Sequence, residues 1–301
     1  MTQPRWLRFS AKCAVIVALF GLILFPISNV LGWNAAGHMM VAKIAYDRLN
    51  PRAKAEADRL MKIQIGPSDA IASNDFINAS HWPDDIKSSK TFPHFDKDHY
   101  IDYPFSPDGT PLPKDQPEAE NIIKALSEDV QILKTSTDDK AKAQALRFLI
   151  HFVGDIHQPL HAVTRVTKAL PNGDRGGNDF HLDTERLHAY WDNGADTFPK
   201  TSPPPEYAPP PISEIVGPAD QIIKEFPDID PAWKAGGPFN FEGWSKESFE
   251  IATHSVYTGL TENSKPSAEY SKASLVIVHG RIAWAGYRLA ALLNTLWPDT
   301  K

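Results

Sequence analysis

The sequence predicts a mainly α-helical protein of one domain, with one small β-hairpin and a long proline-rich loop region. Three observations support this fold class: apolar residues recur at helical spacing through most of the chain, helix-capping residues precede several of these stretches, and residues 199–238 contain 11 of the 26 prolines. The 269 residues that follow an N-terminal leader are enough to bury a sizeable core.

The leader, residues 1–32, has the three-part plan of a secretory signal peptide. It begins with three basic residues and no acidic one, continues as an uncharged apolar stretch over residues 13–25, and ends with the Val30-x-Gly32 spacing that signal peptidases accept. This pattern predicts cleavage after Gly32 and a mature domain of residues 33–301. The alternative is an uncleaved membrane anchor, because the uncharged stretch is nearly long enough to span a bilayer.

Charge and cysteine content narrow the possible functions of the mature chain. Cleavage would remove three positive charges and no negative charge, so the formal net charge would fall from −6 to −9. A protein that binds duplex nucleic acid by neutralising phosphates is normally basic, so fixed metal cations would have to attract any phosphate that this protein binds. The single cysteine, Cys13, lies in the leader. Export without disulfides suits a bacterial periplasm or exterior.

The predicted helices follow one another along the mature chain. Asn34 and Asn50 are suitable N-caps for the first two, and Pro51 favours the first turn of the second. The last predicted helix carries an apolar stripe that should face the core. The helical stretches cover about residues 35–49, 51–62, 68–76, 78–89, 117–135, 138–158, 184–195, 212–225, 241–260 and 268–296.

The hairpin is predicted from two short stretches on either side of a glycine-rich turn. The sequences AVTRVTK, residues 162–168, and NDFHLD, residues 178–183, flank the turn PNGDRGG. Residues 199–238 should form a long irregular excursion that contains at most one helix.

Candidate metal ligands are concentrated in the run HFVGDIHQPLH. His151 and Asp155 are four residues apart on one predicted helix, so their side chains should project from the same face and could hold one metal ion. Pro159 should end or kink the helix and let His161 turn toward a neighbouring point. His157 lies on a different face, where hydrogen bonding within the core is expected. An isolated pair of this kind is more often a buried hydrogen-bonded pair.

A second pair shifts the interpretation toward a metal cluster. In HAYWD, His188 and Asp192 have the same spacing on another predicted helix, while HWPDDIK offers Asp84 and DKDHYID offers His99 and Asp102. Either of these last two segments could instead be a solvated polar turn. Two such pairs, further histidines and no cysteine together indicate nitrogen and oxygen ligands around metal ions. The sequence has no motif of the zinc proteases, P-loop proteins, α/β-hydrolases or dinucleotide-binding folds.

Six motifs, taken in order, closely resemble those of the zinc-dependent single-strand-specific nuclease and 3'-nucleotidase family, the type I nucleases. These motifs are Trp33-x4-His38, HWPD, HYID, HFVGDIHQPLH, GGND and LHAYWD. This resemblance runs through the whole mature chain and implies the helical fold that the family shares with zinc phospholipase C. It also implies a phosphodiesterase that cuts single-stranded RNA and DNA to 5'-phosphorylated products and removes phosphate from 3'-nucleotides.

The resemblance further implies a cluster of three zinc ions (Zn2+) with nine protein ligands. Asp155 would bridge two of the ions, and Trp33 would bind through its free α-amine and its backbone carbonyl. A peptide-bonded nitrogen has no lone pair to donate, so this site would be complete only after cleavage. The implied ligands are Asp84, His99, His151 and Asp155 for the first ion, Trp33, His38 and Asp155 for the second, and His161, His188 and Asp192 for the third.

Catalytic and substrate-binding residues are also implied by the resemblance. The expected catalytic residues are Asp84, Asp155 and Lys87. Hydroxide would attack phosphorus in line, and Lys87 would stabilise the transition state. Stacking on an unpaired base explains a preference for single strands. The residues expected to bind the nucleotide are Tyr100, by stacking on the base, Asp102, by hydrogen bonding to the base edge, and Asn178 and Asn193, by lining the same pocket.

Two other functions are compatible with these motifs. One is a zinc phospholipase C-like lipid phosphodiesterase, although its final ligand is typically a glutamate and its Trp-to-His spacing is longer than in this chain. The other is a non-enzymatic, membrane-anchored zinc-binding protein that keeps its leader. The nuclease interpretation instead predicts a secreted or periplasmic monomer that acts on single-stranded nucleic acid and 3'-nucleotides and has no stable association with a membrane.

Overall fold

The fold is described from a computed structural model of the chain. The structure describes residues 32–66, 74–86, 96–199, 209–227 and 237–299. The first 31 residues of the predicted signal peptide, most of the predicted helix over residues 68–76, and Lys87 lie outside the described residues.

The described chain is mainly helical, as the sequence predicts. Its α-helices are α1 (Ala35–Tyr46), α2 (Pro51–Met61), α3 (Trp82–Asp85), α4 (Ile122–Thr135), α5 (Asp139–Asp155), α6 (Leu187–Asp192), α7 (Ile212–Glu225), α8 (Phe241–Ile251) and α9 (Ala268–Leu296). Its shorter elements are the 3-10 turns η1 (Asn78–Ser80), η2 (Asp96–His99) and η3 (Pro159–Ala162), the π-helical segment η5 (Ala252–Val256), and the strands β1 (Tyr103–Phe105) and β2 (Val163–Arg165).

Capping residues explain where several helices begin. The side chains of Asn34 and Asn50 accept the backbone N–H groups of Gly37 and Ala53, at the starts of α1 and α2, as predicted. Ser267 caps α9 in the same way. The bounds of α7 and α9 agree with the prediction to the residue, whereas α4 begins five residues later than predicted and α8 continues as the π-helical segment η5.

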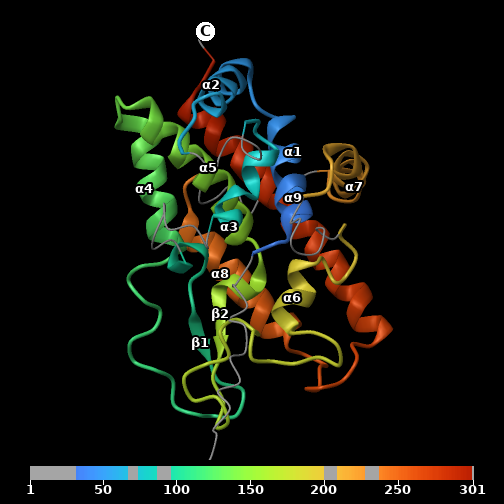
Figure 1. The fold of residues 1–301 in the computed structure, drawn as a ribbon. Helices are drawn as coiled ribbons and strands as arrows, with labels where there is room; N and C mark the ends of the chain where they lie inside the picture. Colours follow the sequence, from blue (N-terminus) through green and yellow to red (C-terminus); the bar gives the residue numbers. More distant parts are fainter. Residues whose placement is uncertain (1–31, 67–73, 87–95, 200–208, 228–236, 300–301) are drawn as a thin grey trace, which may run out of the picture.

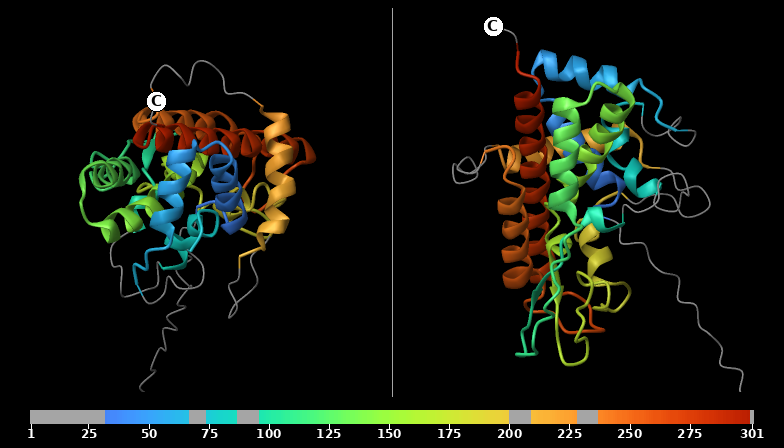
Figure 2. Two further views of the ribbon diagram at one scale, coloured as in Figure 1. Left: turned by 90° about the horizontal axis from the view of Figure 1, so that it is seen from above. Right: turned by 90° about the vertical axis from the view of Figure 1, so that its left-hand side faces the viewer.

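The long helix α9 runs along one side of the molecule (Figure 1 and Figure 2). Helices α1 and α5 pack against it, α4 lies on the outer side of α5, and α7 covers α1. Seen from above, α4 and α7 stand on opposite sides of this central group (Figure 2). Gly286 of α9 permits the close approach of α1, because a Cβ atom at this position would lie 2.5 Å from Cγ2 of Ile44. This packing fixes α1 and α5, which carry much of the site described below.

One hydrophobic core connects these helices. Its largest fully buried side chains include four tryptophans, and the predicted stripe of α9 contributes Ile282 and Leu289. Among the described helices, none is both long enough and apolar enough to cross a bilayer. Within the described part of residues 199–238, α7 is the one helix, in agreement with the prediction.

The small sheet differs from the predicted hairpin. Strand β2 pairs in parallel with β1, in a register that places Tyr103 opposite Val163, and residues 178–183 do not pair with it. The reason lies in the intervening loop, where Oδ1 of Asp174 accepts the N–H of Arg165 at 2.8 Å. The Asp174 carboxylate thus accepts an N–H of β2 that would otherwise bond to the second strand of a hairpin. The hairpin prediction is therefore wrong, and β2 pairs with the distant strand β1 instead.

Candidate metal centre

Three groups of histidine and aspartate side chains gather around the C-terminal end of α5. Within each group, the ligand atoms lie within 4.8 Å of one another, which is close enough to surround one metal ion. The groups are His38, His151 and Asp155; Asp84, His99 and His151; and His161, His188 and Asp192. These are the eight residues expected to bind metal through their side chains, so the structure brings all of them together.

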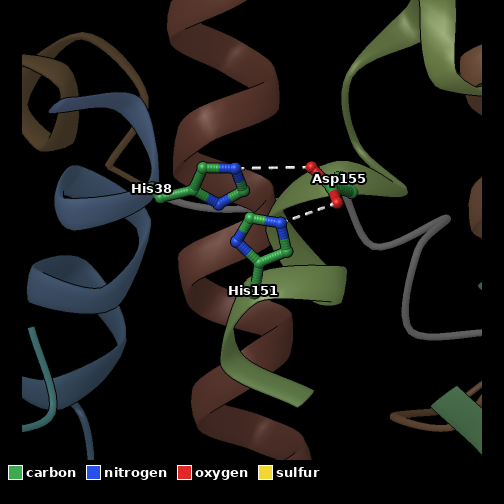
Figure 3. Close-up of side chains that lie close together, drawn as sticks. All are labelled: His38, His151 and Asp155. Carbon is green, nitrogen blue, oxygen red and sulfur yellow. Dashed lines mark ion pairs between the residues drawn. The ribbon is translucent and has the colours of Figure 1, made fainter. Parts of the chain in front are cut away.

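Helix α5 supplies His151 and Asp155 one turn apart, as their spacing predicts. Figure 3 shows these two side chains pointing toward His38, which comes from α1. Oδ2 of Asp155 lies 2.8 Å from Nδ1 of His99 and 3.0 Å from Nε2 of His151, while Oδ1 lies 3.3 Å from Nε2 of His38. Both oxygens of this carboxylate therefore face histidine nitrogens of different groups.

The third group lies just beyond the end of α5. Pro159 begins the turn η3, which directs His161 toward His188 and Asp192 of α6. The rings of His161 and His188 have centroids 5.1 Å apart, and Nε2 of His188 lies 3.5 Å from Oδ2 of Asp192. The predicted turn of the chain at Pro159 is confirmed.

Backbone carbonyls orient three of these histidines. In each, Nδ1 donates to a carbonyl oxygen, so Nε2 is the nitrogen that can bind a cation. A metal ligand needs this arrangement, because the metal takes the lone pair of one nitrogen while the other keeps its proton. These bonds join His151 to Ser80, His161 to His99 and His188 to Gly176, at 2.7, 2.6 and 2.6 Å.

Burial without hydrogen bonds makes the first groups suitable for a cation. His38 is 1% exposed and neither of its ring nitrogens makes a hydrogen bond, and Oδ1 of the fully buried Asp155 makes none either. Buried polar atoms are nearly always paired, so such atoms need a partner. Imidazole nitrogens and carboxylate oxygens are the ligands that zinc accepts. The residues present therefore fit zinc.

The electrostatics of the first groups favour bound positive charge. Burial lowers the pKa of His38 to about 4, so its ring is neutral and can donate a lone pair. Burial disfavours the charged form of His151, but the carboxylates of Asp155 and Asp84 outweigh it and raise its pKa to about 10. Burial alone would raise the pKa of Asp155, yet neighbouring His151 and His161 hold it well below its usual range. A metal cation can take the place of the proton that these carboxylates attract.

The backbone around Trp33 lies against the same centre. The indole N–H of this fully buried side chain donates to the carbonyl of Gly154 at 3.0 Å, and the N–H of Asn34 donates to the carbonyl of Asp192 at 2.9 Å. A Cβ atom built on Gly32 would lie 1.7 Å from Oδ1 of Asp155 and 3.0 Å from Nε2 of His38. The segment that precedes α1 is therefore fixed to α5 and α6, with its backbone in contact with two candidate ligands.

The residues expected to bind the nucleotide come from three segments of the chain. Tyr100 and Asp102 follow η2, where burial raises their pKa values to about 12 and about 7. Nδ2 of Asn178 donates to the carbonyl of Arg175 at 2.9 Å, so its amide holds the glycine-rich loop. Oδ1 of Asn193 accepts from Nδ2 of Asn34 at 3.1 Å, beside the third group. Lys87 lies outside the described residues.

Sequence reasoning missed two residues of this region. Nε2 of the buried Gln158 donates to Oδ1 of Asp192 at 2.7 Å. The positive charge of Arg175 opposes, to a small extent, the rise that burial causes in the pKa values of Tyr100 and Asp102. A polar residue in the middle of a run of ligands was the available signal for Gln158. The predicted role of His157 in the core agrees with the structure, since its ring bonds to Val153 and Arg288.

Comparison with known proteins assigns the chain to a family. The S1/P1 nuclease family model matches residues 33–298. The chain belongs to the S1/P1 nuclease family. Among its relatives, Endonuclease 2 of Arabidopsis thaliana is 29% identical to this chain, over 91% of this chain and 94% of the relative. Nuclease S1 of Aspergillus oryzae is 25% identical over 98% of each chain, and Nuclease P1 of Penicillium citrinum is 27% identical over 53% of this chain and 57% of the relative.

Membership of the S1/P1 nuclease family confirms the resemblance inferred from the motifs. It also confirms the predicted enzyme class, a hydrolase that acts on ester bonds, here phosphodiester bonds. The mainly helical architecture agrees with this assignment. Nucleic acid is the substrate class that the family implies.

Proposed function

We propose that this protein is a secreted or periplasmic zinc-dependent phosphodiesterase. It hydrolyses single-stranded RNA and DNA to 5'-phosphorylated products and releases phosphate from 3'-nucleotides. The observation that carries this proposal is the convergence of three histidine and aspartate groups around the end of α5, in a chain of the S1/P1 nuclease family.

Nine residues would hold three zinc ions in this proposal. Asp155 would be shared between the first two ions, because its two oxygens face His99 and His151 on one side and His38 on the other. When bound, zinc supplies Lewis acidity and lowers the pKa of water toward neutrality. The proposed ligands are Asp84, His99, His151 and Asp155 for the first ion, Trp33, His38 and Asp155 for the second, and His161, His188 and Asp192 for the third.

The proposed catalytic residues are Asp84, Asp155 and Lys87. Other side chains would select and orient the nucleotide. The ring of Tyr100 would stack on a base, which requires a base with a free face and so favours single strands. Asp102 would bond to the base edge, and its pKa of about 7 lets it accept or donate near neutral pH. Asn178 and Asn193 would line the pocket by fixing the glycine-rich loop and the start of the mature chain.

Cleavage after Gly32 is part of the proposal. The mature chain would begin at Trp33, whose α-amine and carbonyl complete the second zinc site. Two observations support this start: the backbone at Gly32 packs against Asp155 and His38, and the family match begins at residue 33. Secretion would thereby complete the active site.

The nuclease proposal is tested with the Asp155→Asn variant of the 33–301 protein. We expect loss of zinc and loss of hydrolysis of a single-stranded oligonucleotide, because the amide lacks the charge and the second acceptor oxygen that sharing requires. The control is Asp139→Asn on the exposed start of the same helix, which should keep its zinc and its activity. Full activity of Asp155→Asn with zinc retained would overturn the assignment.

The same protein separates the two alternative functions. Hydrolysis of phosphatidylcholine without hydrolysis of oligonucleotide would identify a phospholipase C-like enzyme. An exported protein that still begins at Met1 on N-terminal sequencing would identify the anchored, non-enzymatic alternative, since its Trp33 nitrogen would remain in a peptide bond.

A further inference from the structure

Gln158 is a fully buried carboxamide between the candidate ligands Asp155 and His161. Its Nε2 donates to Oδ1 of Asp192 at 2.7 Å, and its Oε1 accepts the N–H of Leu160 at 2.6 Å. Both ends of the side chain are therefore engaged, one by a candidate ligand and one by the backbone of η3.

The backbone of Gln158 is tied to the ligands on either side of it. Its N–H donates to the carbonyl of Asp155 at 2.9 Å, and its carbonyl accepts the N–H of His161 at 3.0 Å. With the side-chain bond to Asp192, this one residue is hydrogen-bonded to three of the proposed ligands. Asp155 belongs to the first group, and His161 and Asp192 belong to the third, so Gln158 joins two of the groups.

The bond to Asp192 determines which way its carboxylate faces. One oxygen is held by the amide of Gln158, which leaves Oδ2 as the oxygen on the side of His188, 3.5 Å from its Nε2. The carbonyl of Asp192 is also fixed, because it accepts the N–H of Asn34. A carboxylate that is already oriented loses less conformational entropy when it binds a cation.

Neighbouring helices hold Gln158 in place. Oγ of Ser248 in α8 donates to the carbonyl of Ile156 at 2.6 Å, and Nε of Arg281 in α9 donates to the carbonyl of His157 at 2.9 Å. The two residues before Gln158 are thus anchored to the core, and the amide has a fixed base from which to reach Asp192.

We propose that Gln158 is a positioning residue that orients Asp192 and thereby sets the affinity of the third group for its zinc ion. A carboxamide suits this role because it donates to the carboxylate and accepts the N–H of Leu160 without adding a buried charge. A glutamate at this position would keep an acceptor for Leu160 but would place a second carboxylate against Asp192. This proposal rests on the proposed function, and it names the residue that sets the zinc affinity of one of the three proposed metal sites.

The test measures zinc bound per chain across a series of buffered free-zinc concentrations. The variants are Gln158→Met, which loses both side-chain bonds, and Gln158→Glu, which loses the donor to Asp192. Asp192→Asn shows which ion belongs to the third group. Ser245→Ala in α8 is the matched control, because this buried hydroxyl bonds to the carbonyl of Glu242 and to Tyr103, and not to a ligand or to residues 156–158. The melting temperature of each zinc-free protein reports the effect on folding alone.

We expect both Gln158 variants to bind the ion identified by Asp192→Asn about 10- to 100-fold more weakly and to keep the other two. Ser245→Ala should bind all three with unchanged affinity, even if its zinc-free form melts at a lower temperature. Unchanged affinity in both Gln158 variants, or an equal loss of all three ions, would overturn the positioning role. Retention of every ion by Asp192→Asn would instead contradict the proposed zinc site itself, and the positioning role with it.

Discussion

At the scale of single residues, the candidate ligands depend on partners that are remote in the sequence. The H-x3-D spacing predicts that His151 and Asp155 share a helix face, but it does not predict that the carbonyl of Ser80 takes the proton on Nδ1 of His151. Such carbonyls select the tautomer that leaves Nε2 for a cation. The same applies to Gln158, because its bond to Asp192 joins residues 34 positions apart.

Glycine at position 154 gives His38 its place in the centre. A Cβ atom at Gly154 would lie 2.7 Å from Nδ1 of His38, and the ring cannot move away freely because it stacks on His151 with centroids 3.9 Å apart. We therefore expect Gly154→Ala to displace the His38 ring, to weaken zinc binding and hydrolysis, and to lower the free energy of unfolding by about 1–3 kcal/mol.

Zinc binding, hydrolysis of an oligonucleotide and denaturant unfolding together check the expectation for Gly154. Gly280→Ala in α9 is the control, since its Cβ atom would make an ordinary contact 3.4 Å from Phe226. This substitution should stabilise the helix by about 0.5–1 kcal/mol and leave zinc binding unchanged. A Gly154→Ala protein with normal zinc affinity would show that His38 tolerates the shift or is not a ligand.

At the scale of elements, helices were predicted better than strands because their determinants are local. The apolar spacing of α7 and α9 lies within each helix, Ser267 directly precedes and caps α9, and the bounds of both helices were predicted correctly. The strand at residues 163–165 was predicted, but its partner was not. That pairing depends on Asp174, whose carboxylate accepts the N–H of Arg165 and the hydroxyl of Tyr257 and so holds the glycine-rich loop against β2 and the residue after η5.

The interface between α4 and α5 contains a destabilising carboxyl group. A cavity of about 210 Å³ between these helices is lined partly by Asp98, Glu128 and Asp129. Asp129 is 8% exposed, and its Oδ2 makes no hydrogen bond. Burial, reinforced by the neighbouring acids Asp98 and Glu128, raises the pKa of Asp129 well above its usual value. The folded protein therefore binds this proton more tightly than the unfolded chain does.

The raised pKa of Asp129 gives stability a defined pH dependence. Between the unfolded and the folded pKa values, the folded state binds more protons, so the free energy of unfolding should fall as pH rises through this window. Asp129→Asn removes the charge and should raise stability at pH 8 by about 1 kcal/mol or more, since each unit of pKa shift corresponds to about 1.4 kcal/mol. The gain should shrink toward pH 4, close to the ordinary pKa of an aspartate, and vanish below about pH 3, where both states are protonated.

Urea unfolding of both proteins from pH 4 to pH 8 measures this dependence. The control is Asp220→Asn, the same substitution on the exposed face of α7, which should change stability by no more than about 0.5 kcal/mol. Equal stability of the wild-type protein and Asp129→Asn across the whole range would mean that Asp129 is ionised and satisfied in the folded protein.

At the scale of the whole molecule, the proposed zinc ions link segments that are distant in the sequence and that no disulfide joins. Residues 33–301 contain no cysteine, so no disulfide can brace them. The candidate ligands come from α1, α3, η2, α5, η3 and α6. Metal binding to such a set contributes directly to folding stability, and it places positive charge at one point of a chain whose formal net charge after cleavage is −9.

The start of the mature chain should therefore decide whether the centre is complete. We expect a protein that begins at Trp33 to bind three zinc ions, and one that begins at Gly32 to bind the second ion on the order of tenfold more weakly or worse. In the longer protein the Trp33 nitrogen is an amide without an available lone pair, and the backbone of Gly32 occupies space against Asp155 and His38.

Both proteins are released from a fusion partner by a protease, and zinc content and oligonucleotide hydrolysis are compared. A protein that begins at Trp33 and has one residue added after Lys301 is the control. Equal zinc content and activity for the two N-termini would show that the Trp33 amine is not a ligand and that cleavage serves export alone.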